Sequence, residues 1–493
     1  MPDSGRFSKG HLMHNMHKYG ILLVLLFAVH ILTTSCGQEW EYEEVLDPVY
    51  EIGAYTVHTI NLVIPNWMHN HPYINHTAAF NTAARRLDAE IRPSGERFQL
   101  NIIPIPSFGI DAIHYVQRKE LRMMAGQPYD IFFIDKHLHN VWRYAQNGFL
   151  ADVYALIDES PNVSRYDFYT NVLDAFKMGG NLYTFPLNFT VDLIGINTNA
   201  PQSLVDEFSL KTTVTLHELM SIYLNGAVHH WSIFDGFFLQ QRDVFPRLVS
   251  DFVNLSELTS SMNQNSFIDA LSVFQRVQLR NGFMEYTMFR GTDGLTFPRV
   301  EDASDSFMFV SHSFRTYPLL AFFEPHRPSF VNIIPVSNEI GQLYIQTLYN
   351  FALANTNQSS LVWEFLNLLV NPLLTQFRDV NRTMAWNPLL LPIKKTYAEE
   401  HISSTLGRIE TRFLSREGPH DDVIIIPDSE ARAEIYKTIT ETILKWAEMP
   451  MAPVPLVTFD FLQDDIEQLL HGILTPEEAA QRMHNRVVLW LIE

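Results

Sequence analysis

Residues 183 to 197 read Tyr-Thr-Phe-Pro-Leu-Asn-Phe-Thr-Val-Asp-Leu-Ile-Gly-Ile-Asn. From Tyr183 to Leu193 every odd position is apolar and every even position is polar or proline, the pattern of a strand with one dry and one wet face. Fifteen extended residues would span about 50 Å, whereas a typical strand spans roughly 17–20 Å. We therefore expect a segment that leaves one lobe, shows Asn188, Thr190 and Asp192 to water, and enters a second lobe.

The end of this stretch has a different pattern. After Asp192 the alternation stops, and residues 193–196 are typical of a strand buried on both sides. The change of pattern predicts that the wet face lies before Leu193 and the core of the second lobe begins there.

Length and composition also indicate more than one lobe. At 493 residues the chain exceeds the size at which single hydrophobic cores stop growing. Of all residues, 46% are hydrophobic and 13% are aromatic. This composition can fill large cores. The formal net charge of −20 argues against nucleic acid as a partner, because affinity for phosphates comes largely from Lys and Arg.

The amino terminus has the pattern of a secretory signal. Basic residues precede an apolar run that begins at Gly20, and Leu32-Thr33-Thr34-Ser35-Cys36-Gly37 follows it. This pattern is similar to a bacterial lipoprotein signal, in which the peptide is cleaved before the cysteine and the thiol of Cys36 receives a lipid. The alternative is a plain anchor helix with an incidental cysteine. Both interpretations leave the body of the protein outside the cytoplasm on a membrane tether.

The next part of the chain has the order of a parallel α/β sheet. Residues 37–54 carry many acidic side chains without a period, and we expect a solvated linker there. Strands and helices then alternate, a pattern that favours a parallel sheet covered by helices. The expected strands are 60–65, 98–105 and 129–134, and the expected helices are 78–91, 110–125 and one through 141–144.

A second set of elements follows residue 197. Thr215 and Glu218 have the spacing of a capping box, and so do Thr475 and Glu478, each at the start of a predicted helix. The later expected strands are 306–310, 344–349 and 389–393, and the later expected helices are 361–370, 460–470 and one after Thr475.

Polar and aromatic residues follow the ends of the predicted strands, where ligands bind in parallel α/β sheets. Aromatic rings stack on the apolar faces of sugars, while Asp and Asn bond the sugar hydroxyls. An aromatic ring of this kind, taken alone, is more often part of a core than a ligand contact. From placement alone we expect these ligand contacts: Asn66, Trp67, Asp135, Asn188, Thr190, Asp192, Phe234, Asp235, Tyr317, Tyr349 and Trp386.

Two other kinds of function remain open. His69, His71, His137 and His139 follow two strand ends of one predicted sheet and could converge on zinc, although loop histidines would give the same pattern. Paired carboxylates of a glycan-active enzyme cannot be identified from spacing in sequence. No nucleophile elbow, zinc-protease motif or phosphate loop is present in the sequence, so we expect no catalysis and no cofactor.

Three stretches resemble a known family. Residues 129–135 followed by 144–153 are similar to the first-lobe motif of bacterial extracellular solute-binding proteins, the lipoprotein receptors of carbohydrate-type ABC importers, of family 1 and like the maltose-binding protein. Residues 181–199 are similar to that family's first crossing between lobes. Residues 461–491 resemble its last helix pair. The resemblance covers most of 60–493, with looser matches at 250–304 and 399–453.

The resemblance implies a two-lobed α/β fold of the periplasmic-binding-protein type II class. It also implies that residues 344–349 and 389–393 are the second and third crossings. The lobes would then be 55–187 with 346–390, and 188–345 with 391–493, after a signal peptide of 1–36. The implied partners are a sugar in the cleft, ABC permease subunits and the membrane through the lipid anchor, with the protein itself a monomer facing the exterior or periplasm.

Overall fold

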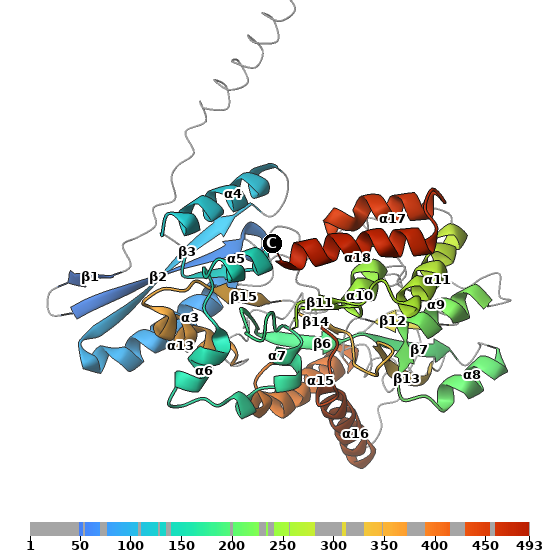
Figure 1. Cartoon of the computed structure of the whole chain (residues 1–493). Coiled ribbons are helices and arrows are strands. Elements are labelled where there is room, and N and C mark those ends of the chain that lie inside the picture. The colour runs from blue at the N-terminus through green and yellow to red at the C-terminus, as the bar shows by residue number, and fades with distance from the viewer. Residues whose placement is uncertain are drawn as a thin grey trace, which may run out of the picture. The chain divides into compact units, whose positions relative to one another are not determined.

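The amino-terminal strands form a six-stranded sheet, here called the first sheet, in the computed structural model (Figure 1). β2 is parallel to β3 and to β4, while β1 pairs antiparallel with β2. β15 pairs antiparallel with both β4 and β5. The strands are β1 (Val49–Ile52), β2 (Tyr55–Pro65), β3 (Glu96–Ile105), β4 (Ile131–Phe133), β5 (Thr184–Pro186) and β15 (Asn350–Leu353).

The structure describes residues 49–52, 55–69, 76–106, 110–126, 129–134, 140–197, 201–225, 233–234, 241–255, 257–281, 308–311, 330–347, 349–371, 390–414, 429–453 and 459–492. Contacts divide the chain into Met1–Leu46 and Asp47–Glu493, and all the described residues belong to the second unit. Within the described residues, no helix combines the length and the apolar character needed to cross a membrane.

The strands of the first sheet follow the predicted order. β2 and β3 begin earlier than predicted, and β4 is shorter than the predicted strand 129–134. The apolar run of β2 is buried from Thr59 to Pro65, as expected for a central parallel strand. We expected the linker to extend to residue 54, but its last part is structured. Val49–Ile52 forms β1, which pairs with Tyr55–His58 at the start of β2. A strand end without a neighbour offers free backbone groups, and β1 satisfies them.

Helices cover both faces of the first sheet. α3 (His76–Ile91) and α13 (Ser359–Leu369) lie on one face and α4 (Ile110–Met124) on the other (Figure 1). β3 and β4 lie on opposite sides of β2, so two right-handed crossovers place their helices on opposite faces. The shorter helices of this region are α2 (Asn66–His69), α5 (Val141–Gln146), α6 (Val153–Glu159), α7 (Thr170–Asp174), η1 (Arg92–Ser94) and η2 (Arg165–Asp167).

A five-stranded second sheet has the order β8-β13-β7-β12-β9. Its central strand β7 pairs antiparallel with both β13 and β12, and Leu193 and Ile194 are fully buried. This confirms the strand buried on both sides that was predicted at 193–196. The strands are β7 (Leu193–Asn197), β8 (Val214–Thr215), β9 (Ile233–Phe234), β12 (Met308–Ser311) and β13 (Phe330–Ser337), and a separate pair is β10 (Val253–Asn254) with β11 (Thr259–Ser260).

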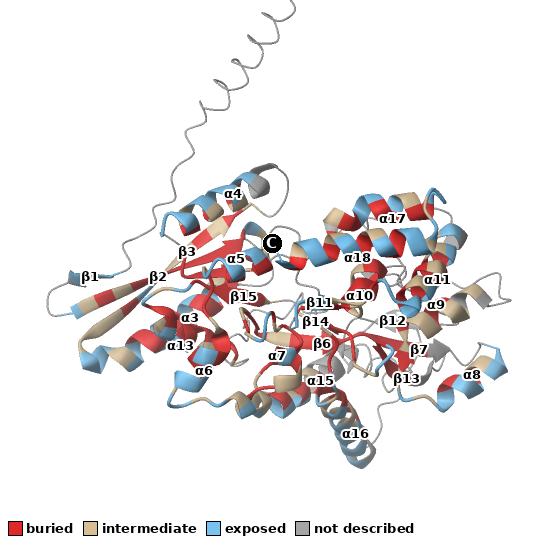
Figure 2. Ribbon diagram, in the orientation of Figure 1, coloured by how far each residue is buried: buried red, intermediate tan, exposed pale blue. Residues whose placement is uncertain are grey.

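The helices of the second half include both predicted capping boxes. The backbone N–H of Thr215 donates to Glu218, and the backbone N–H of Thr475 donates to Glu478, both at 2.9 Å. Figure 2 shows the buried stripes of these helices facing inward. The helices are α8 (Gln202–Ser209), α9 (Leu216–Asn225), α10 (Gln241–Ser250), α11 (Asn265–Asn281), η5 (Lys395–Tyr397), α15 (Ala398–Leu414), α16 (Ser429–Ala447), η6 (Asp460–Leu462), α17 (Gln463–Leu470) and α18 (Pro476–Ile492).

A third sheet has three short antiparallel strands in the order β14-β6-β16. They are β6 (Asn188–Val191), β14 (Ile345–Gln346) and β16 (Leu391–Pro392). β6 pairs with β14 through Val191 and Ile345, and with β16 through Phe189 and Leu391. These strands are the three segments expected to cross between lobes.

Residues 183–197 therefore contribute to all three sheets in turn. β5 belongs to the first sheet, β6 to the third and β7 to the second. The segment is too long for one sheet, as its length indicated, and it is divided at Leu187 and Asp192. Of the predicted strand 344–349, only Ile345–Gln346 forms a strand, β14, and β15 begins just after the predicted range at Asn350.

Candidate ligand-binding site

The carboxyl ends of β2 and β4 mark the point where the strand order of the first sheet reverses. β2 connects through α3 to β3 on one side, and β3 connects through α4 to β4 on the other side of β2. Adjacent loops leave such a point in opposite directions, and ligands of open α/β sheets bind there. Pro65 ends β2 and Phe133 ends β4, so the residues next to them are the first candidates.

Four aromatic side chains meet at this edge, and we call them the aromatic cluster: Trp67, His76, Phe133 and Tyr349. The ring centres of Trp67 and His76 are 5.8 Å apart, those of Trp67 and Phe133 6.0 Å, and those of His76 and Tyr349 5.4 Å. All three pairs meet edge to face, an arrangement that aromatic rings prefer. Trp67, Phe133 and Tyr349 are half-buried, so parts of their surfaces reach solvent.

Four separate segments hold the aromatic cluster. Trp67 lies in the short helix α2, which follows β2 directly and is anchored by the fully buried Met68. His76 is the first residue of α3, and Phe133 is the last of β4. The carbonyl oxygen of Tyr349 accepts a hydrogen bond of 2.9 Å from the backbone N–H of Leu187. The cluster is thus tied to the segment that runs through the three sheets.

The hydrogen bonds of His76 connect α2 to Tyr349. Its Nδ1 lies 3.1 Å from the carbonyl oxygen of Met68, and its Nε2 lies 2.8 Å from the hydroxyl oxygen of Tyr349. Burial raises the pKa of Tyr349 above its usual value, so the hydroxyl keeps its proton at physiological pH.

Two asparagines are close in sequence to residues that form or hold the aromatic cluster. Asn66 is exposed at the start of α2, beside Trp67. Asn188 follows Leu187, whose backbone bonds Tyr349, and its side chain is half-buried. The Oδ1 atom of Asn188 is buried and has no hydrogen-bond partner among the described residues. A buried carbonyl oxygen without a donor is a costly arrangement.

The structure corrects the expected exposure of Thr190 and Asp192. Thr190 is 1% exposed and Asp192 is 0% exposed. Asp192 pairs with Arg247 of α10 at 3.0 Å between Oδ2 and Nη2, and its Oδ1 accepts a 3.0 Å bond from the side chain of Gln346. Side chains from α10 and β14 contact Asp192, and both Thr190 and Asp192 are buried, so these two residues do not face water as their alternation indicates.

The pair of Asp192 and Arg247 continues into a larger set that we call the buried polar network: Asp192, Arg247, Asp251, Tyr344 and Gln346. The hydroxyl of Tyr344 donates to the Oδ2 atom of Asp251. Burial raises the pKa of Asp251 to about 7, although hydrogen bonds from Tyr344 and Asn338 act in the opposite direction. The network connects α10 and the residue after it to Asp192 and to the segment of β14.

The remaining predicted contacts cannot be placed. Asp135, Asp235, Tyr317 and Trp386 lie outside the described residues, as does Cys36. The backbone of Phe234 forms part of β9, next to β12. These residues stay predictions.

The zinc hypothesis is untested for the same reason. His71, His137 and His139 lie outside the described residues, and His69 is exposed at the end of α2. In the part of the chain that the structure describes, no group of three or more His, Cys, Asp or Glu side chains could hold a metal ion.

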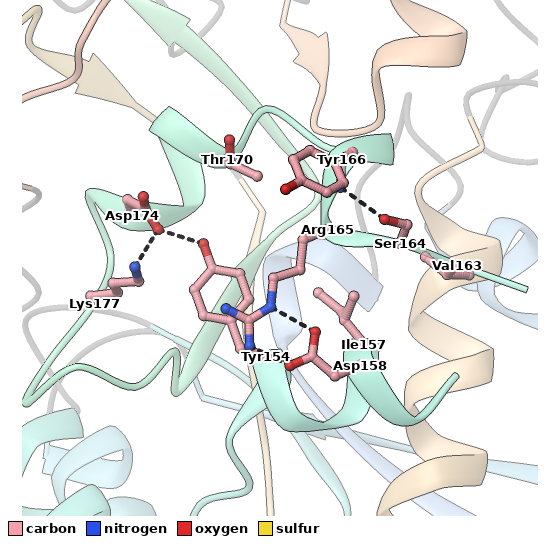
Figure 3. Close-up of a pocket in the computed structure, with 10 residues that line it drawn as sticks. All are labelled: Tyr154, Ile157, Asp158, Val163, Ser164, Arg165, Tyr166, Thr170, Asp174 and Lys177. Carbon is pink, nitrogen blue, oxygen red and sulfur yellow. Dashed lines mark hydrogen bonds and ion pairs between the residues drawn. The ribbon is translucent and has the colours of Figure 1, made fainter. Parts of the chain in front are cut away.

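A separate pocket of about 450 Å³ lies between α6, η2 and α7 (Figure 3). The guanidinium of Arg165 lies 4.1 Å from the ring centre of Tyr154 and donates to Asp158 at 2.7 Å. The Tyr154 hydroxyl donates to Asp174 at 2.6 Å, and Lys177 pairs with the same carboxylate. Each cation here has its own anion, so the pocket carries no uncompensated charge with which to attract an ion.

Sequence reasoning selected Trp67 and Tyr349 but not the two residues that join them. Phe133 was assigned to a strand interior, and His76 stood just before the expected helix start at Ala78. Their positions along the chain could have indicated both residues as site candidates. Phe133 ends a strand and His76 begins a helix at the same edge of the sheet.

No known family model matches the chain, and no curated protein matches its sequence. Its structure is similar to that of an extracellular solute-binding protein family 1 from Alicyclobacillus acidocaldarius subsp. acidocaldarius DSM 446. The TM-score is 0.50 at 12% identity, over 90% of this chain and 100% of that one.

Two further solved structures are similar at lower scores. The cyclic alpha-maltosyl-1,6-maltose binding protein from Arthrobacter globiformis has a TM-score of 0.46 at 13% identity, over 87% of this chain and 98% of that one. The sugar-binding protein MalE from Xanthomonas citri has a TM-score of 0.46 at 12% identity, over 88% and 97%. All three are binding proteins by name, not enzymes.

The chain therefore has the two-lobed α/β fold of periplasmic-binding proteins, with crossing strands between its sheets. More narrowly, this is the fold of the extracellular solute-binding proteins of family 1. The fold class expected from the sequence is confirmed.

Proposed function

We propose that this protein is the substrate-binding receptor of an ABC importer and that it binds a mono- or oligosaccharide without catalysing a reaction. The observation that carries the proposal is the half-buried aromatic cluster at the reversal point of the first sheet. Asn66 precedes Trp67 in the chain, and Asn188 follows Leu187, which bonds the backbone of Tyr349. This is the edge at which open α/β sheets bind small molecules.

The composition of the site favours a neutral sugar. Trp67 and Phe133 offer ring surface for the apolar face of a pyranose. The half-buried side chain of Asn188 carries an amide, and Tyr349 carries a hydroxyl. None of these four side chains carries a charge at neutral pH.

We further propose that closure of two lobes transmits ligand binding to a permease. The lobes would be 55–187 with 346–390, and 188–345 with 391–493. The sheets support this division. All strands of the first sheet except β1 lie within the residues of the first proposed lobe, and all strands of the second sheet lie within those of the second proposed lobe. The third sheet gathers the three crossings, and a few short segments that absorb rotation are the usual form of a hinge.

Cys36 is the proposed lipid attachment point, with signal peptide 1–36 removed and residues 37 to about 48 as a linker. The protein would then act as a monomer on the outer side of the cell membrane, facing the exterior or periplasm. Mass spectrometry of the protein from its native membrane tests this part: a diacylglycerol adduct on an amino-terminal Cys36 supports it, and an unmodified Cys36 contradicts it.

The binding proposal is tested by a thermal-shift screen of the purified full chain, followed by calorimetry. Glucose, galactose, maltose, cellobiose and xylobiose are compared with amino acids, a dipeptide and zinc chloride. A ligand bound by the folded state alone raises the Tm, by an amount that grows with its concentration over its Kd. A shift with one sugar and none with zinc supports the proposal; a shift with zinc alone, or release of a cleaved sugar, overturns it.

Substitutions then locate the site. Trp67→Ala should weaken the best sugar by about 10- to 100-fold, because a half-buried ring that stacks on ligand contributes roughly 1–3 kcal/mol. Tyr166→Ala is the matched control, since this aromatic residue is 88% exposed and lies in the pocket of Figure 3. Equal affinities of both variants would place sugar binding elsewhere.

A further inference from the structure

The ring of His76 is held between two oxygen atoms of different character. Nδ1 lies 3.1 Å from the carbonyl oxygen of Met68, and Nε2 lies 2.8 Å from the hydroxyl oxygen of Tyr349. A carbonyl oxygen has no proton and can only accept. The hydrogen of this bond must therefore be on Nδ1.

The other ring nitrogen is then an acceptor. His76 is 2% exposed, and burial disfavours a charged ring. A neutral imidazole with its proton on Nδ1 has a lone pair and no proton on Nε2. The bond to Tyr349 can form in one direction only, with the tyrosine hydroxyl donating to Nε2.

This direction fixes what Tyr349 can offer to a ligand. A phenol hydroxyl has a single proton, and here that proton points to His76. No second hydrogen bond to the Tyr349 hydroxyl is present among the described residues. Its oxygen keeps lone pairs, so towards the half-buried side of the ring Tyr349 can only accept.

We propose that His76 is a specificity-determining positioning residue that makes Tyr349 an acceptor and so selects ligands that present a hydrogen-bond donor at this point. A free sugar hydroxyl fits. A glycosidic ether oxygen, a carboxylate or a phosphate does not, because each would face the lone pairs of Tyr349 with an acceptor of its own. This inference rests on the proposed function and narrows it to neutral sugars with an unsubstituted hydroxyl at Tyr349.

The first test needs no ligand. Long-range proton–nitrogen NMR of the full chain with labelled histidine reports which ring nitrogen carries the proton, and His76→Gln identifies the signal that belongs to His76. We expect a protonated Nδ1 and an unprotonated Nε2. A ring protonated on Nε2, alone or on both nitrogens, at pH 7.5 overturns the proposal, whatever the protein binds.

The second test uses the best sugar of the thermal-shift screen with its monodeoxy and monodeoxyfluoro derivatives. Fluorine accepts but does not donate, so at the hydroxyl that meets Tyr349 the fluoro derivative should bind about 10-fold or more weaker than the parent, as weakly as the deoxy derivative. Tyr349→Phe should reduce this difference to less than about twofold.

Two outcomes separate this inference from the proposed function. If no sugar binds, the proposed function fails, and the tautomer of His76 still decides the first step of the inference. If a sugar binds but every fluoro derivative matches its parent, the receptor stands and the acceptor role of Tyr349 is wrong. The test with fluoro derivatives does not depend on the folding of His76→Gln, because Tyr349→Phe leaves the imidazole in place.

Discussion

Tyr344 and Tyr349 stand on either side of β14, five positions apart in the same crossing segment, and their hydroxyls have different partners. The hydroxyl of Tyr344 donates to the carboxylate of Asp251 inside the buried polar network. The hydroxyl of Tyr349 bonds the ring of His76 in the half-buried aromatic cluster. One tyrosine therefore belongs to a closed set of internal bonds, and the other keeps acceptor capacity towards a ligand.

The comparison shows that polarity in a crossing segment does not by itself indicate a ligand site. Asp192 already pairs with the guanidinium of Arg247 and accepts from the amide of Gln346, so little of its hydrogen-bonding capacity remains for a ligand. Asn188, four residues earlier in the same crossing segment, keeps a buried oxygen without a donor among the described residues. The internal partners of each side chain, more than its residue type, divide the segment into support and site.

Asp192→Ala should have the largest effect on stability. It removes the anion from Arg247, whose side chain is 13% exposed, and leaves a nearly buried guanidinium without this partner. Breaking a buried ion pair in this way costs about 3–5 kcal/mol of the free energy of unfolding. Urea denaturation measures the loss.

The matched control is Asp158→Ala, which breaks the pair with Arg165 at the surface. An exposed pair contributes at most about 1 kcal/mol. Equal losses for the two variants would mean that the buried polar network gives no special support to the third sheet.

The pH dependence of stability should carry a contribution from Asp251. Burial raises its pKa to about 7, whereas an unfolded Asp titrates at about 3.9. Between these values the native state holds a proton that the unfolded state has released. The free energy of unfolding therefore falls as the pH rises from about 4 to about 7, by up to about 1.4 kcal/mol per pH unit, and this contribution is constant above that window.

Asp251→Asn tests this slope, because an amide resembles the protonated carboxyl and does not titrate. Urea denaturation between pH 4.5 and 8 should show a shallower fall for the variant than for the unchanged chain. Parallel curves would mean that Asp251 has an ordinary pKa and that its carboxylate is charged inside the network across this pH range.

Local patterns predicted the elements well and their partners less well. Periodicity located β2, β3, α3 and α18, and side-chain spacing located both capping boxes, because these features depend on neighbours in sequence. The length of residues 183–197 predicted a crossing. Its division among three sheets could not be predicted, since β14 and β16 come from distant parts of the chain.

The candidate site shows the same limit. Trp67 and Tyr349 were selected from strand ends, but the histidine between them has a polar partner on each nitrogen that no local pattern encodes. Alternation marked Asp192 as polar and outward, and it could not show that α10 covers that face with Arg247. An amphipathic pattern separates two faces of a strand, and the tertiary structure decides which of them meets water.

The smallest expected effects come from removing the same oxygen atom at the two tyrosines. Tyr344→Phe takes a donor from the buried carboxylate of Asp251, so the free energy of unfolding should fall by about 1–3 kcal/mol while sugar affinity changes less than about twofold. Tyr349→Phe should do the reverse, weakening the best sugar by about 5- to 10-fold with a stability loss near 1 kcal/mol.

Calorimetry and urea denaturation of both variants give the four values that this comparison needs. If both variants lost stability equally, Tyr349 would be part of the internal support. If both lost sugar affinity equally, the buried polar network would be part of the ligand-binding site. An opposite pattern of losses would locate the boundary between hinge and site within the five positions that separate the two hydroxyls, because each variant differs from the unchanged chain by one oxygen atom in the same crossing.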